Sequence, residues 1–259
     1  MGLAISLTSL GQVKEGKIIY DRTMQMPSRI FANLDPEVAA KIPKSRTEQY
    51  ELLFGNGQSL YQFLPTASNE ESGATFGGGG MIIRMSGGGN DIIYHNFEKA
   101  QKVEQRELMD RNYVITDSIR AGEWKLTDET RKILNYTARK AIGKRISQRR
   151  QMSMENGEMK TQIIPDTAVV VAWFTTEIPV PVGPEMQGQL PGAILELDIN
   201  NGEVVYKAIE FSPKVNVSKI KEPKDGKKMS QAEFALERDK VMEEMRKNMP
   251  AGRTMRITN

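Results

Sequence analysis

Hydrophobic positions along the chain follow β-strand spacing over most of its length. The run Val169–Phe174 is apolar throughout and rich in β-branched residues, which is typical of a largely buried strand. The dipeptide Asn201-Gly202 lies between a second strand-like segment, Ala193–Asp198, and a third that begins at Glu203, and it favours a tight hairpin. Other strand-like segments, separated by turn residues, are 13–22, 47–54, 59–63, 91–97, 100–108, 112–116, 123–126 and 130–146. Their short spacing predicts an antiparallel meander.

Two helices are predicted from capping signals. Proline suits the first helical position, so Asp35 can cap a short helix over Pro36–Lys41. Ser230 and Glu233 form the capping box of a long helix at about 230–249. The apolar face of this helix is Phe234, Val241, Met242, Met245 and Met249. We therefore predict an α+β fold, in which a predominantly antiparallel, curved β-sheet carries a short N-terminal helix and one long C-terminal helix.

The chain is predicted to form one domain, residues 13–259, after a short leader, residues 1–12. The leader is small and apolar and ends in Ser9-Leu10-Gly11, so it resembles the second half of a signal peptide. A disordered leader or a first strand is the alternative interpretation. Since no stretch approaches the ~20 apolar residues that span a bilayer, no transmembrane segment is expected in the mature chain.

The loop before Ala193 carries a family resemblance. Residues 172–179 (AWFTTEIP), 183–185 (GPE) and 190–194 (LPGAI) resemble the signature of the GLPGLI family, whose members are bacterial proteins, mostly of Bacteroidota, that typically carry signal peptides. Segments 15–20, 58–61, 124–126 and 135–141 extend the resemblance over nearly the whole chain from about Val13. Gln189 and Ala193 depart from the family motif, and Asn135 and Ala138 stand where relatives often have Gly and Cys.

The resemblance implies an exported protein, periplasmic or associated with the outer membrane or the cell exterior, and it implies no particular activity. The composition excludes several further classes of partner and site. The chain has 36 basic and 33 acidic residues, a net charge of +3, which is too weak to indicate nucleic acid as a partner. There is no cysteine, which excludes disulfides, thiol nucleophiles, zinc ribbons and a lipobox in the visible chain.

The sequence gives little indication of a catalytic site. The chain has a single histidine, His95, which any Ser-His-Asp triad would need, and a histidine-rich zinc site is excluded by count. The setting of His95 in a strand-like segment favours a structural role. The glycine clusters at 77–80 and 87–89 lack the Lys-Ser/Thr of a phosphate loop, so they favour a flexible hairpin insertion. No cofactor is expected.

Acidic and basic side chains leave two alternatives open. Glu177, Glu185 and Glu196 lie near the signature, and a carboxylate-dependent hydrolase could use two of them if their surroundings separate their pKa values. Capping or anchoring of the loop is the structural alternative. The basic run within 139–150 suits a solvated hairpin face, and contact with anionic lipid headgroups is its functional alternative.

Methionine is unusually frequent, with 15 residues in the chain. Thioethers select Cu(I) when no thiolate is present, so a copper site is an alternative function. Packing is the competing explanation, because Met readily fills irregular gaps. The candidate copper ligands are Met24, Met26, Met152, Met154 and Met159.

The leading functional hypothesis is a non-enzymatic cell-envelope protein that binds a lipid, a peptide or a protein partner. A curved sheet with a helix on one face can leave a groove, and the rigid loop 179–192 would shape its mouth. The surface expected to matter is Trp173, Phe174, Leu190, Pro191 and Gly192. Core packing and backbone geometry are the alternative roles for these residues.

Overall fold

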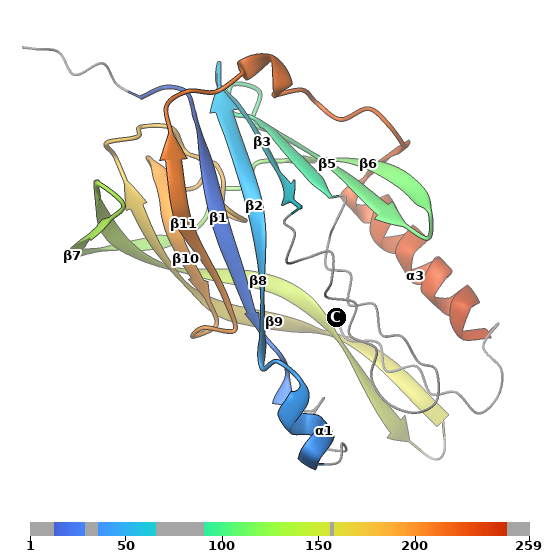
Figure 1. Cartoon of the computed structure of the whole chain (residues 1–259). Helices are drawn as coiled ribbons and strands as arrows, with labels where there is room; N and C mark the ends of the chain where they lie inside the picture. Colours follow the sequence, from blue (N-terminus) through green and yellow to red (C-terminus); the bar gives the residue numbers. More distant parts are fainter. Residues whose placement is uncertain (1–12, 29–35, 66–90, 156–157, 248–259) are drawn as a thin grey trace, which may run out of the picture.

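The computed structural model of the whole chain describes residues 13–28, 36–65, 91–155 and 158–247 (Figure 1). The N-terminal leader and the two glycine clusters of the sequence analysis lie outside these ranges. In the described part of the chain the strands are β1 (Gly16–Gln25), β2 (Ser45–Gly55), β3 (Gln58–Leu64), β4 (Ile92–Asn96), β5 (Gln101–Leu108), β6 (Arg111–Ser118), β7 (Trp124–Ile133), β8 (Tyr136–Glu155), β9 (Glu158–Thr175), β10 (Ala193–Ile199), β11 (Val204–Ser212) and β12 (Lys227–Ser230).

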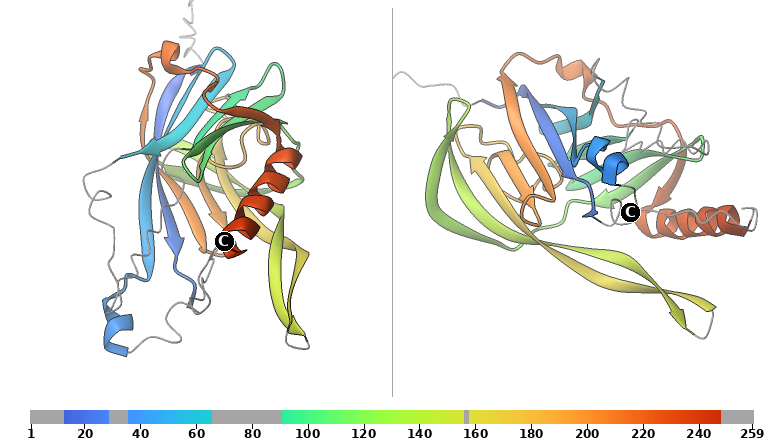
Figure 2. Two further views of the ribbon diagram at one scale, coloured as in Figure 1. Left: turned by 90° about the vertical axis from the view of Figure 1, so that its right-hand side faces the viewer. Right: turned by 60° about the horizontal axis from the view of Figure 1, so that its bottom comes forward.

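All twelve strands join one sheet in the order β12-β6-β5-β4-β3-β2-β1-β11-β10-β9-β8-β7. Two antiparallel meanders, β1 to β6 and β7 to β11, are therefore joined side by side through the pairing of β1 with β11. The pairing of β12 with β6 is parallel. The sheet is strongly twisted and curved (Figure 2). The predicted meander is confirmed for the described strands.

Tight turns follow the sequence signals. Asn56 and Gly57, between β2 and β3, have φ of 52° and 69°, as a two-residue hairpin turn of mirror-image type requires. Asn200, Asn201 and Gly202 also have positive φ, and they connect β10 to β11. The sequence Gly55-Asn56-Gly57 also predicts a turn, so this turn and the hairpin predicted at Asn201-Gly202 are both confirmed.

The predicted α+β class is wrong, because the fold is largely all-β. Helix α1 (Pro36–Lys41) has six residues and η2 (Val217–Lys219) has three. Helix α3 (Gln231–Lys247) begins with the predicted capping box: the Ser230 N–H donates to Glu233 Oε2 (2.7 Å), and the Glu233 N–H donates to Ser230 Oγ (3.3 Å). However, α3 meets the sheet at one corner, where Phe234 packs on Tyr113, and it does not form a layer.

One face of the sheet, called the inner face below, carries the main core. Cross-strand neighbours Tyr20, Tyr50 and Tyr61 lie on this face, as do Tyr206 and Ala172 of the second meander. The loop 176–192 packs on the same face and buries Ile178, Val182, Met186 and Leu190. The core is therefore completed by a loop rather than by a helix.

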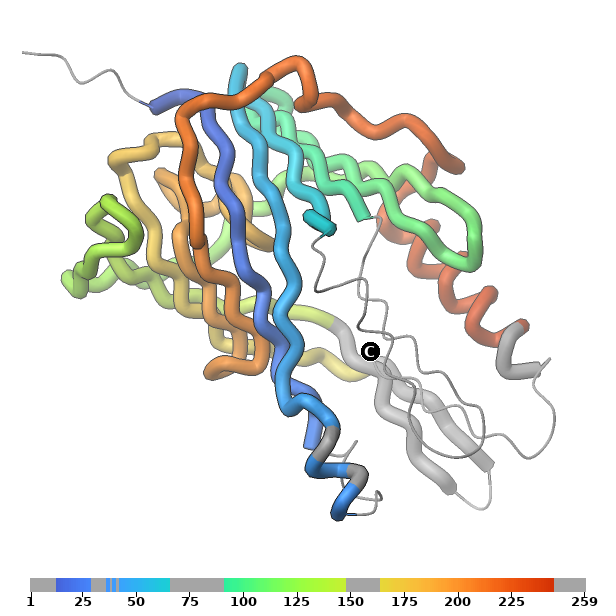
Figure 3. Tube along the Cα trace, viewed as in Figure 1, coloured from blue at the N-terminus to red at the C-terminus, as the bar shows by residue number. Residues whose placement is uncertain are grey.

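The opposite face of β2 to β6 is covered by the chain that follows β11. Figure 3 shows this segment passing across the end of the first meander toward α3. Val217 and Ile220 pack there against a second apolar cluster that includes Leu53 and Leu60. Both faces of the first meander are thus covered in part.

Strands β8 and β9 are longer than their neighbours. β7 pairs with β8 as far as Gly143, and β10 pairs with β9 as far as Val170. Beyond these points β8 and β9 pair only with each other, up to Glu155 opposite Glu158. We call residues 144–155 and 158–169 the arm, which extends away from the rest of the sheet (Figure 2). The sequence Met154-Glu155-Asn156-Gly157 predicts a hairpin tip, and the pairing of Glu155 with Glu158 agrees with it, although residues 156 and 157 lie outside the described ranges.

Gly192 is expected to tolerate no side chain. A Cβ at this position would lie 2.1 Å from the Thr175 carbonyl oxygen, which belongs to the backbone. Gly192→Ala should therefore lower the free energy of unfolding by about 3 kcal/mol. Pro191→Ala is the matched control, because Pro191 is exposed, and it should change stability by less than about 1 kcal/mol. Urea unfolding measures both, and equal midpoints would contradict this assignment.

Candidate functional site

The structure separates the five residues that the sequence analysis singled out. Phe174 and Leu190 belong to the main core and are 2% and 4% exposed. Gly192 is buried against backbone, whereas Pro191 is exposed. Trp173 lies on the outer face, where the Arg131 guanidinium sits 4.0 Å from its ring centroid. These residues therefore do not form one surface, and packing accounts for Phe174, Leu190 and Gly192.

The same loop instead places a carboxylate on the inner face. Glu185 has φ of 58°, a left-handed conformation that costs a residue other than glycine roughly 1 kcal/mol or more. In this conformation Glu185 Oε1 accepts a hydrogen bond from the Tyr206 hydroxyl (2.7 Å). Arg22 Nε donates to the same hydroxyl oxygen (3.0 Å). A chain of hydrogen bonds thus runs from β1 through β11 to the loop.

A second carboxylate, Glu48, neutralises the other side of Arg22. Glu48 is 2% exposed, and its Oε2 lies 3.3 Å from Arg22 Nη1. Its Oε1 lies 2.8 Å from Arg46 Nη2, and the Tyr50 hydroxyl donates to Oε2 (3.2 Å). Burial and the nearby Glu48 charge raise the pKa of Tyr50 to about 12. Each Glu48 oxygen therefore lies beside an arginine, although Oε1 makes no hydrogen bond, and the ion pairs are consistent with a structural role.

Tyr61, on β3, differs from its neighbours because its hydroxyl has no hydrogen-bond partner although the residue is only 6% exposed. Its ring stacks on that of Tyr50, with centroids 5.1 Å apart. Burial raises the pKa of Tyr61 well above its ordinary value, and the nearby Tyr206 and Glu185 raise it further. A buried hydroxyl without a partner costs about 1–3 kcal/mol, so its retention calls for a reason.

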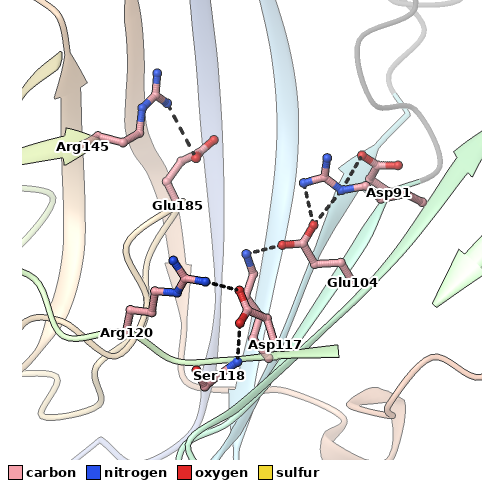
Figure 4. A network of polar contacts seen from close by, with 9 residues as sticks. Asp91, Glu104, Asp117, Ser118, Arg120, Arg145 and Glu185 are labelled. Carbon is pink, nitrogen blue, oxygen red and sulfur yellow. Dashed lines mark hydrogen bonds and ion pairs between the residues drawn. The ribbon is translucent and has the colours of Figure 1, made fainter. Parts of the chain in front are cut away.

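Arg145 approaches Glu185 from the root of the arm (Figure 4). Its Nη1 lies 3.9 Å from Glu185 Oε2, which is too long for a hydrogen bond, and its Nε is buried without a partner. The side chains of Arg145 and Glu185 are 36% and 39% exposed, so solvent reaches them. We call the group of four side chains Tyr61, Arg145, Glu185 and Tyr206 the Glu185 slot.

The slot offers both kinds of hydrogen-bonding group. The Tyr61 hydroxyl and Arg145 Nε–H can donate, and Glu185 Oε2 can accept. A group that accepts and donates at adjacent atoms matches this pattern, and a peptide amide is the commonest such group in proteins.

The three acids near the signature lie in different settings. Glu177 accepts a hydrogen bond from the Thr137 N–H (2.8 Å), which anchors the loop to β8. Glu196 lies opposite Trp173 and pairs with Arg131 (2.7 Å) on the outer face. Only Glu185 reaches the slot. Among the described residues, no group of three His, Asp or Glu side chains is arranged to hold a metal ion.

The candidate copper ligands lie in two separate parts of the sheet, at β1 and on the arm. Met24 lies in β1 opposite Val204 and Arg46, and Met26 follows the end of that strand. On the arm, Met154 pairs with Met159, and Met152 lies opposite Thr161. The backbone register thus brings two of the five close together, and a copper site stays a prediction.

A second buried network lies farther along the inner face (Figure 4). Glu104, 4% exposed, is paired with Lys102 and accepts from Arg106 Nε (2.6 Å). Burial opposes ionisation of Glu104, but Arg106 and Lys102 outweigh it and hold its pKa below the ordinary value. His95, on the neighbouring strand, stacks on Phe97 with ring centroids 6.1 Å apart.

The hydroxyls of Tyr61 and Tyr20 provide a matched pair of tests. Tyr61→Phe should raise the free energy of unfolding by about 1 kcal/mol, because it removes a buried hydroxyl that has no partner. Tyr20→Phe should lower it by about 1–2 kcal/mol, because the Tyr20 hydroxyl donates to the buried Ile194 carbonyl (2.7 Å). Urea unfolding of both variants measures the two signs. A loss of stability in Tyr61→Phe equal to that in Tyr20→Phe would show that the Tyr61 hydroxyl is satisfied.

His95 should make stability depend on pH. Burial and the nearby Lys102 lower the pKa of His95 from 6.5 to about 4. Between these two values His95 is protonated in the unfolded chain but neutral in the folded chain. The free energy of unfolding therefore falls as pH drops from about 6.5 toward about 4. Between pH 7 and pH 5 the loss should be about 2 kcal/mol.

The control for this prediction is His95→Gln, which should reduce the loss between pH 7 and pH 5. Asp91, whose pKa is raised by burial, and Glu104 titrate in both proteins, so the difference isolates His95. Urea unfolding at the two pH values measures it, and parallel losses in both proteins would rule out this role.

Part of the chain matches a protein family. Residues 124–196 match the model of a family described as "Protein of unknown function (Porph_ging)". The match runs from the start of β7 into β10, so it includes Arg145 and Glu185 but not Tyr61 or Tyr206. It covers 73 of 259 residues, less than the extent of the resemblance to the GLPGLI family, whose name it does not confirm. No curated protein matches the chain.

Two crystal forms of one solved protein share the fold. The structure of PNGF-II in the P21 space group superposes with a TM-score of 0.51 and 16% identity, covering 88% of this chain and 34% of that one. The C2 form gives a TM-score of 0.50 and 15% identity, covering 85% and 32%. At this identity the likeness concerns the fold alone, and this chain spans about a third of the length of those structures. Among the described residues, no helix is long and apolar enough to cross a membrane.

Proposed function

We propose that this chain is a non-enzymatic binding or accessory module that holds a peptide segment, free or part of a protein partner, in the Glu185 slot. The observation that carries the proposal is the buried Tyr61 hydroxyl without a partner beside the strained Glu185. An amide N–H of the segment donates to Glu185 Oε2, and its carbonyl accepts from Tyr61 and Arg145. Binding would then supply the hydrogen bonds that the folded chain leaves unmade.

The polarity of the slot favours a peptide over a lipid chain. Two of its four residues, Arg145 and Glu185, carry ionisable groups that form a loose ion pair, and the other two are tyrosines, of which Tyr206 donates to Glu185. An acyl chain placed here would remove water from these groups without giving hydrogen bonds in return. A peptide amide restores both donors and acceptors.

The placement of the acids supports binding over hydrolysis. A two-carboxylate hydrolase needs both acids at one site, with their pKa values separated by their surroundings. Glu177, Glu185 and Glu196 instead have three different partners, and Glu196 lies on the other face of the sheet. The accessory role is supported by the solved structures of similar fold, in which the matching part is about a third of a longer chain.

Export to the periplasm, the outer membrane or the cell exterior is the second part of the proposal. It is supported by the resemblance of the sequence to the GLPGLI family and by the apolar residues 1–12. A peptide-holding module would then act on partners in the cell envelope.

Mass spectrometry under non-denaturing conditions tests the proposed ligand. The protein is purified from the envelope fraction of its own host, together with the double variant Tyr61→Phe, Arg145→Met. The natural protein should carry adducts with peptide masses, and the double variant should lose at least about nine-tenths of them, because both donors are gone. Arg131→Met is the control, since Arg131 lies on the outer face over Trp173, and it should keep the adducts.

The result that contradicts the proposal is an unbound mass for the natural protein, or equal adducts in the natural protein and the double variant. A lipid mass in place of a peptide would also contradict it. A copper adduct that disappears on Met152→Leu with Met154→Leu would assign the binding to the arm methionines.

A further inference from the structure

Among the described residues, one edge of β8 has no strand partner along the arm. From Lys144 to Glu155, the described partner of β8 is β9 alone, because β7 pairs with β8 only up to Gly143. The open edge therefore continues the line of β7 outward from the sheet (Figure 2). A strand edge without a partner is a row of free N–H and C=O groups that can pair with another strand.

The backbone groups that face this edge can be identified. Antiparallel partners alternate between pairs that exchange hydrogen bonds and pairs whose N–H and C=O groups point outward. The Asn200 N–H donates to the Val169 carbonyl from outside the β8–β9 ladder (2.8 Å), so Val169 and its partner Lys144 form an outward-facing pair. The register of β8 with β9 shows no shift. Counting by two along β8, the residues that face the open edge are Ile146, Gln148, Arg150, Met152 and Met154.

The edge of β9 is different because it contains a proline. Pro165 pairs with Gln148, and the same alternation places its nitrogen on the outer edge of β9. Proline has no N–H, so this edge lacks a donor near its middle. Residues 144–155 of β8 contain no proline or glycine. The arm thus has one edge that is interrupted and one that is complete.

Basic residues outnumber acidic ones along the open edge of β8, which favours a partner of negative charge. Apart from the slot residue Arg145, residues 144–155 contain three basic residues, Lys144, Arg149 and Arg150, and one acidic residue, Glu155. Two copies of this edge would bring like charges together, which disfavours pairing between two copies of the chain. An acidic strand would meet opposite charge, and the exposed Ile146 (78%) offers it an apolar contact.

We propose that the open edge of β8 binds an extended, acidic segment of a partner protein as an added strand. Backbone hydrogen bonds from Ile146, Gln148 and their outward-facing neighbours hold the segment, and the excess of basic residues in the sequence 144–155 favours an acidic one. This inference goes beyond the proposed function, because it rests on a backbone edge of the arm and not on the slot of the inner face.

Fluorescence anisotropy with defined peptides tests the proposal. The probe is a labelled twelve-residue peptide that alternates Val and Glu, and its partner probe has Lys in place of each Glu. The natural protein should bind the Glu peptide and bind the Lys peptide at least about a hundredfold more weakly. Gln148→Pro removes one outward N–H without removing a bond to β9, and it should weaken binding of the Glu peptide at least about tenfold.

The matched control is Thr167→Pro, which removes an outward N–H from the edge of β9 and should change affinity by less than about twofold. Circular dichroism and urea midpoints establish that both variants fold. The proposal is overturned if the Glu peptide does not bind, if the Lys peptide binds equally well, or if the two proline variants lose affinity equally. Sedimentation that shows a dimer broken by Gln148→Pro would also overturn it, because the edge would then belong to a second copy.

Discussion

The pairing of β1 with β11 is the contact on which the rest of this structure depends. It joins two meanders that would otherwise be separate sheets, and its partners lie far apart in the chain, as in Arg22 opposite Tyr206. The hydrogen bond from the Tyr20 hydroxyl to the Ile194 carbonyl spans 174 residues. Closing such a long loop is costly in entropy, so the apolar inner face must form together with the pairing. The pairing of β1 with β11 also places Arg22 opposite Tyr206, which allows the chain of hydrogen bonds from Arg22 to Glu185.

The inner face buries charged groups in two different ways. Glu48 and Glu104 are each held by two cations, so the cost of removing their charge from water is offset at least in part. The Tyr61 hydroxyl and Arg145 Nε have no such partners, and Glu185 holds a left-handed backbone conformation. Glu48 Oε1 and His95 Nδ1 also lack a hydrogen bond, so the slot is set apart by the combination of its unmet donors with the left-handed Glu185 and not by unmet groups alone.

The two meanders differ in how they are covered and in how far their strands extend. The first meander is covered on both faces, by the inner core and by the segment around Ile220. The second continues past its neighbours as the arm, where β8 and β9 have only each other as partners. A two-stranded ribbon is marginally stable alone, so the arm adds little to the stability of the sheet.

Local signals in the sequence determined the turns, the strands and the cap of α3. Asn56-Gly57 favours its hairpin through backbone conformation alone, and Ser230 with Glu233 caps α3 through neighbouring groups. The sequence did not determine the fold class, because a capping box says where a helix begins but not that only Phe234 among the described residues of α3 is buried. In the sequence, Arg145 belongs to a basic run that is typical of a solvated hairpin face, although it shares the alternation of Ala141 and Gly143, which are buried. Only the tertiary structure decides which of the two alternating faces of a strand is buried. For this reason Trp173 lies on the outer face, whereas its neighbour Phe174 lies in the core. The physical reason is that alternation is a property of one strand, whereas burial depends on the loop 176–192 and on strands almost two hundred residues apart.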